Sequence, residues 1–253
     1  MNPVRAIAHF GDRGRRVLEL MGRTLRVSPR VRPGAFVDAL GQMALSALPL
    51  VGIAHFFAGM VIVLQSATEL GRFGSNHLVG DIISLALVRE LAPIFTALLM
   101  AGKAGAGLAS ELGMLTLSGQ TQAMRALSID IDRDVIAPKV IAVIWGTVLL
   151  TIAAILMGLL GGMLLSDAKL GISATHFLNR CIGALGPADF ACGLIKAAAF
   201  GGIIAVVGVT AGLKAKRDAA DLGRHTMQAV VTASFLVLVS DHVLTSLIVA
   251  VTG

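Results

Sequence analysis

The sequence predicts an all-α membrane protein with an N-terminal interfacial amphipathic helix, five transmembrane helices and a cytoplasmic coupling helix between the second and third. Of 253 residues, 56% are hydrophobic and 14% charged, whereas soluble domains carry about a quarter charged residues. Several apolar runs reach the roughly 20 residues that a helix needs to cross a bilayer. The 29 glycines fit the close packing of membrane helices. These three observations define the fold class.

The N-terminal region, residues 1–40, predicts an interfacial helix, and residues 41–253 predict the transmembrane domain. Apolar residues recur at spacings of three and four, and arginines fall on the opposite side of the same helix. The apolar positions are Ile7, Phe10, Val17, Leu18, Met21 and Leu25. We expect this helix to lie along the membrane surface with its basic face toward lipid headgroups. A soluble amphipathic arm docked on a partner is the alternative.

The five spans are expected at about residues 45–64, 78–115, 140–165, 190–213 and 227–251. The second span includes the glycine-rich stretch GKAGAGLASELG, residues 102–113. This stretch lacks the residue order of a phosphate-binding P-loop, and no nucleotide-binding, catalytic or metal-ligand pattern occurs elsewhere in the sequence. Its small-residue pairs Gly102–Ala106 and Gly105–Ala109 favour close helix packing instead. We therefore expect no enzyme activity, metal or cofactor in this chain.

The Lys and Arg residues predict the orientation. Sixteen lie in residues 1–40, 103–139 and 214–224, and only three lie in the connections on the other side. Cytoplasmic segments carry the excess of positive charge in membrane proteins. The N-terminus is therefore expected in the cytoplasm and, after five spans, the C-terminus outside. The net charge of +6 is a topology signal on this interpretation, not a sign of nucleic-acid binding.

Four charged residues fall within the expected spans: Arg89, Glu90, Lys196 and Asp241. A charged side chain at the bilayer centre costs about 2.5–3.5 kcal/mol on insertion scales. Their formal charges cancel and their estimated depths overlap, so we expect one polar cluster inside the bundle. This cluster is either a buried salt bridge that fixes helix register or a functional gate or headgroup-sensing site.

The segment 116–138 between the second and third spans predicts a short cytoplasmic helix near residues 119–128. A short helix joining two long spans has the shape of a coupling helix that docks on an ATPase, and an ordinary solvated loop fits the sequence equally well. The candidate coupling residues are Gln120, Gln122, Met124, Arg125 and Leu127.

Four stretches together resemble one family: LVRELAPIFTALLMAGKAGAGLASELGML, IAPKVIAV, LIKAAAF and VLVSDHVLTSL. They are similar to the MlaE (YrbE) permeases, the membrane subunits of MCE-associated ABC transporters that move phospholipid between membranes. In this family the buried polar residues correspond to Arg89, Glu90, Lys196 and Asp241. Gly119-Gln120 departs from the family pattern, which commonly has Glu-Gln there.

The resemblance implies a homodimer in the bacterial inner membrane with a lipid cavity between the two copies. It also implies a cytoplasmic ABC ATPase that binds the ATP and Mg²⁺, an outer-side MCE-domain protein and, in many systems, a small STAS-domain subunit. Acyl-chain contacts are expected near the first hairpin, at Leu64, Leu70, Phe73 and Leu78. Two alternatives stay open: a proton-coupled secondary transporter with Glu90 and Asp241 as carriers, and a scaffold that only anchors the ATPase and the outer-side protein.

Overall fold

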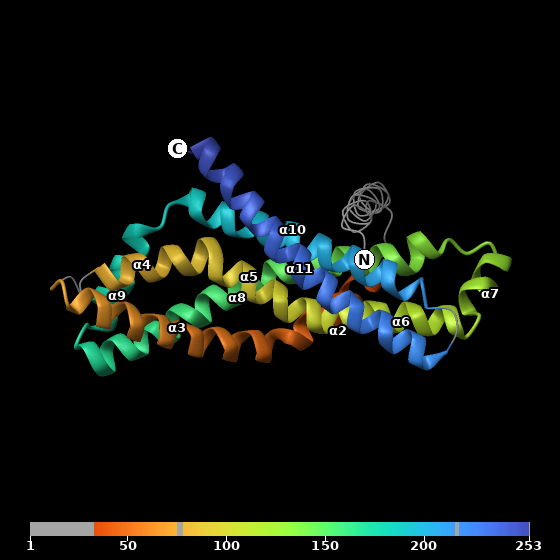
Figure 1. Cartoon of the computed structure of the whole chain (residues 1–253), viewed down its shortest axis with the longest axis horizontal. Coiled ribbons are helices and arrows are strands. Elements are labelled where there is room, and N and C mark those ends of the chain that lie inside the picture. Colours follow the sequence, from red (N-terminus) through yellow and green to blue (C-terminus); the bar gives the residue numbers. More distant parts are fainter. Residues whose placement is uncertain (1–32, 75–77, 216–217, 253) are drawn as a thin grey trace, which may run out of the picture.

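The computed structural model of the chain describes residues 33–74, 78–215 and 218–252. In these residues the chain forms helices joined by short turns, without a strand. Most of the long helices run along the long axis of an elongated bundle, and the last one, Ala219–Thr252, crosses them obliquely (Figure 1). The predicted all-α membrane fold is therefore confirmed, while the expected interfacial stripe from Ile7 to Leu25 lies outside the described residues.

Five helical segments of the described chain are long and apolar enough to cross a membrane, as predicted. Each extends beyond its predicted limits at one end or at both, because the helices continue past their apolar centres. The segments are Pro33–Gly71, Val79–Leu117, Asp132–Leu170, Pro187–Gly212 and Ala219–Ile248.

The first span consists of α2 (Pro33–Met43) and α3 (Leu48–Gly71), joined by a 3₁₀ turn at Leu45–Ala47. Pro49, at the start of α3, has no backbone N–H and suits the first turn of a helix. The Lys103 ammonium donates a hydrogen bond to the Ser46 carbonyl, one of the groups that the break leaves free. α2 packs on α8, so the expected boundary at residue 40 falls inside a membrane-associated helix.

The second span is interrupted twice by π-helical turns, at Leu87–Leu91 and Ala101–Gly105. These turns separate α4 (Val79–Ala86), α5 (Ala92–Met100) and α6 (Ala106–Leu117). Pro93 follows the first turn and donates no backbone hydrogen bond, so the helix rearranges around it. Single π turns inside α-helices occur frequently at functional sites, and the first one here contains both Arg89 and Glu90.

The third span follows a short helix, α7 (Gln120–Ala126), which begins after Gly119 in a left-handed conformation. A π turn, Asp132–Ile136, then leads into α8 (Ala137–Leu170). α8 ends at Gly171, whose φ of 66° is a conformation that glycine adopts readily. Figure 1 places α7 at one end of the bundle, beyond α6.

The connection between the third and fourth spans contains a helix that the sequence did not predict, α9 (Ala174–Ala184). The Ser173 hydroxyl caps its start. Phe177 and Cys181 are buried against the second-span side of the bundle, and Arg180 forms an ion pair with Asp81 of α4. α4 and α9 therefore close the end of the bundle opposite α7 (Figure 1).

The last two spans are α10 (Pro187–Gly212) and α11 (Ala219–Thr252). Glycines bring α10 close to α6: a Cβ on Gly208 would lie 2.9 Å from the Gly105 oxygen, and one on Gly212 would lie 2.7 Å from the Ala109 oxygen. The Gly105–Ala109 pair therefore serves helix packing, as predicted. Gly102, in contrast, faces open space.

Candidate functional site

Lys196 of α10 is the centre of a charged cluster inside the bundle. Its side chain has no exposed surface. Its Nζ atom lies 2.5 Å from Glu90 Oε2, 2.6 Å from the Thr245 hydroxyl and 3.1 Å from Asp241 Oδ1. The second, fourth and fifth spans therefore meet at one ammonium group.

The local backbone explains why these side chains reach one another. Gly193 packs directly against the carbonyl oxygen of Val88, too closely for any side chain at that position. This contact holds α10 against the π turn that contains Glu90. Lys196, three residues after Gly193, then faces the Glu90 carboxylate on the same side of α10.

Thr245 joins the cluster without carrying a charge. Its hydroxyl accepts a hydrogen bond from Lys196 and lies 3.4 Å from both Glu90 carboxylate oxygens. It stands four residues after Asp241, so both side chains lie on one face of α11. Its spacing from Asp241 was the one sequence signal that could have revealed it.

Arg89 does not join Lys196, which corrects the expectation of a single four-residue cluster. Its Nε donates to Asp189 Oδ1 over 2.5 Å, and Nη2 pairs with the same oxygen. The physical reason is that neighbouring residues of a helix point in different directions, so Arg89 and Glu90 face different partners. The Arg89 side chain remains 53% exposed.

Asp189 was missed because the sequence places it at the edge of the fourth span. It lies near the start of α10, where its Oδ2 atom accepts the Gly186 backbone N–H over 2.7 Å. One carboxylate oxygen therefore caps the helix and the other holds Arg89. Arg89 and Glu90 are adjacent in the chain, so the two ion pairs are neighbours.

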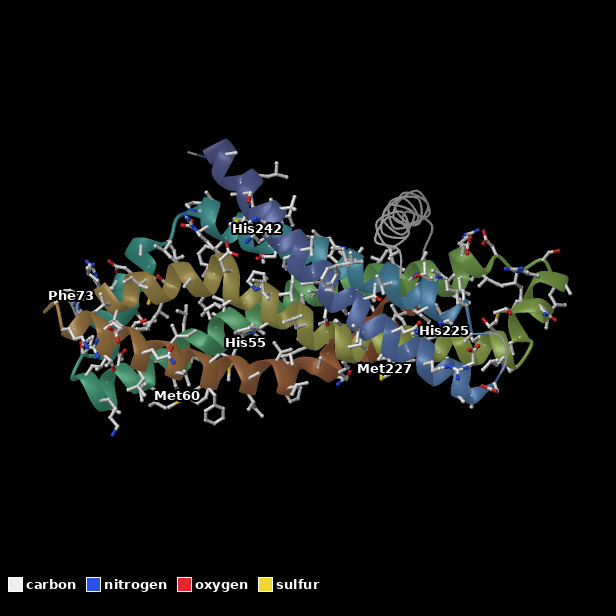
Figure 2. The ribbon with its side chains drawn as sticks, in the orientation of Figure 1. His55, Met60, Phe73, His225, Met227 and His242 are labelled. Atoms are coloured by element: carbon white, nitrogen blue, oxygen red, sulfur yellow. The ribbon has the colours of Figure 1, made fainter. Side chains whose placement is uncertain are left out.

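His55 and His242 do not extend the site. The Nδ1 atom of buried His55 lies 2.7 Å from the Val51 carbonyl oxygen, and its ring stands against Phe95. His242 is exposed beside Asp241 (Figure 2). Among the described residues, no group of three His, Cys, Asp or Glu side chains is placed to hold a metal ion.

The expected lipid-contacting residues take two kinds of position. Leu64 and Phe73 are exposed, and Phe73 lies at the far end of the first hairpin (Figure 2). Leu70 packs partly against the small core around Val63 and Phe177, and Leu78 is half-buried.

The expected coupling residues lie on or directly after α7. The side chains of Gln120, Gln122 and Arg125 are exposed, and Leu127 is 73% exposed. Met124 packs partly against the main core and fixes α7 to the bundle. The chain therefore presents a small, partly apolar surface at this tip.

Charged residues joined across three apolar spans are typical of membrane proteins that move ions or substrates. The chain matches the model of the permease MlaE over residues 36–247. It belongs to the MlaE permease family.

Relatives from several organisms are similar to the chain over most of its length. A probable ABC transporter permease protein of Rickettsia prowazekii is 33% identical over 227 residues, 88% of each chain. The intermembrane phospholipid transport system permease protein MlaE of Haemophilus influenzae is 29% identical, covering 83% of this chain and 81% of its own. The chloroplastic protein TRIGALACTOSYLDIACYLGLYCEROL 1 of Arabidopsis thaliana is 35% identical over 75% of this chain and 54% of its own.

Proposed function

We propose that this chain is the membrane subunit of an ATP-driven transporter that moves phospholipid between membranes. The observation that carries the proposal is the intramembrane charged site, built by three spans of a chain in the MlaE permease family. The printed name of the Haemophilus influenzae relative, an intermembrane phospholipid transport permease, supports phospholipid as the substrate class.

A separate cytoplasmic ABC ATPase supplies the energy in this proposal, because the sequence contains no nucleotide-binding motif. The exposed tip formed by α7 and Leu127 supports a docking surface for that ATPase. ATP and Mg²⁺ would be bound by the ATPase, and closure of two ATPase subunits would be transmitted through α7 to the spans.

The assembly around the chain is also part of the proposal. Two copies form a homodimer in the bacterial inner membrane, with the N-terminus in the cytoplasm and the C-terminus in the periplasm. An outer-side MCE-domain protein receives or delivers the lipid, and a STAS-domain subunit accompanies the ATPase. The excess of Lys and Arg in residues 1–40, 103–139 and 214–224 of the sequence supports this orientation.

The test is co-purification. The full chain, expressed with the ABC ATPase of the same genome, should carry the ATPase through affinity purification and raise its rate of ATP hydrolysis in phospholipid vesicles. A chain that binds no ATPase, or binds one without changing its hydrolysis rate, refutes the proposal.

A further inference from the structure

The charged side chains at the site do not balance. Three carboxylates, on Glu90, Asp189 and Asp241, accompany the two cations Arg89 and Lys196. Among the other described side chains, the ion pairs between different helices are balanced: Asp81 with Arg180, and Glu111 with Lys139. A charge without compensation is unfavourable away from water. The site therefore has one carboxylate in excess.

The carboxylate oxygens of Glu90 and Asp241 receive few hydrogen bonds. Glu90 Oε1 has only a long contact, 3.4 Å, with the Thr245 hydroxyl. Asp241 Oδ1 accepts no hydrogen bond, and its 3.1 Å approach to Lys196 is an ion pair without hydrogen-bond geometry. A single ammonium serves both carboxylates. Both carboxylates therefore keep hydrogen-bond acceptors that this ammonium does not fill.

The side chains of Glu90 and Arg89 are both partly exposed, although they face different partners. The Glu90 side chain is 35% exposed, so a ligand can approach its carboxylate. Arg89 directs two nitrogens to one oxygen of Asp189. A guanidinium has five N–H donors, and the remaining ones suit a phosphate group.

We propose that the site binds a phospholipid headgroup with a primary ammonium, as in phosphatidylethanolamine. The phosphate contacts Arg89, and the ammonium contacts Glu90, the partly exposed carboxylate that shares the Lys196 ammonium with buried Asp241. An anionic headgroup such as phosphoglycerol adds negative charge and supplies no ammonium. A quaternary ammonium such as choline supplies charge but no N–H donor. The inference rests on the proposed function, because it assigns the headgroup class of the lipid transported.

The test measures bound lipid directly. The full chain is reconstituted in bilayers of equal parts phosphatidylethanolamine, phosphatidylcholine and phosphatidylglycerol with identical acyl chains, and lipids retained in mild detergent are counted by native mass spectrometry. We expect phosphatidylethanolamine to exceed phosphatidylglycerol by about tenfold, the equivalent of about 1.4 kcal/mol. Glu90→Gln should bring this ratio close to one, and Asp241→Asn should lower it severalfold.

Asp81→Asn is the matched control, because it removes a carboxylate from a balanced pair and should leave the ratio unchanged. Equal binding of the lipids by the unmodified chain, or a preference that survives both Glu90→Gln and Asp241→Asn, overturns the inference. Phosphatidylcholine bound as strongly as phosphatidylethanolamine overturns the assignment to a primary ammonium. If either Glu90→Gln or Asp241→Asn does not fold, the lipid ratio measured with the other variant tests the inference.

The outcome is separable from that of the proposed function, because binding is measured without the ATPase. A headgroup preference with no ATP-driven lipid movement refutes the proposed function alone. Lipid movement without a headgroup preference refutes this inference alone.

Discussion

Replacing Lys196 by methionine tests the energetic role of the charged cluster. The change keeps the length and apolar stem of the side chain and removes the ammonium that Glu90, Asp241 and Thr245 share. Removing one partner of a buried ion pair costs about 3–5 kcal/mol. Because Glu90 is one-third exposed, we expect the lower end of that range.

The assay is thermal unfolding of the purified chain in detergent, followed by circular dichroism. For a domain of this size, 1 kcal/mol shifts Tm by about 2–4 °C, so Lys196→Met should lower Tm by about 6–12 °C. The triple variant Lys196→Met, Glu90→Gln, Asp241→Asn should recover most of the loss, since no charge is stranded. A single variant that unfolds at the normal temperature, or a triple variant no more stable than the single one, refutes the reasoning.

Three further predictions test packing, thiol chemistry and docking. Gly161→Ala should lower the Tm of the chain, because the added methyl group would clash with the backbone of α3. Gly41→Ala is the control, since a methyl group there meets open space and should leave Tm unchanged. Thermal unfolding compares the two variants. Burial and a nearby carboxylate raise the pKa of Cys181 to about 11. Alkylation of Cys181 by iodoacetamide, followed by mass spectrometry, should therefore be slow at pH 8 and faster as the pH approaches that value. Fast alkylation at pH 8 contradicts the burial. Leu127→Ser should weaken co-purification of the ATPase. Ile182→Ser, on α9 and about as exposed, is the control and should not weaken it. Equal effects of the two changes would contradict docking of the ATPase on α7.

The number and approximate positions of the spans could be predicted because long apolar runs have few other stable environments. The length of the spans beyond these apolar runs could not be predicted. The first span begins at Pro33, about three turns before its expected start near residue 45, since α2 packs on α8 through contacts that hydropathy does not record. α9 was missed because its polar sequence is stabilised by tertiary contacts: buried Phe177 and the Arg180–Asp81 ion pair.

The charged residues themselves could be found from sequence, because charge inside an apolar span is conspicuous. Their partners could be predicted only in part. In the structure Lys196 pairs with Glu90 and Asp241, whereas Arg89 pairs with Asp189. The direction of Arg89 depends on the π turn and on where α10 begins, and both are set by packing between helices.

The central claim is that ATP hydrolysis by a partner drives phospholipid movement through this chain. The most direct measurement is transfer of labelled phospholipid between vesicles by the reconstituted complex, with an active or a hydrolysis-deficient ATPase and with or without a protonophore. We expect transfer to require the active ATPase and to continue when the proton gradient is collapsed. Transfer that persists with the inactive ATPase and stops with the protonophore would contradict the account and identify a proton-coupled transporter.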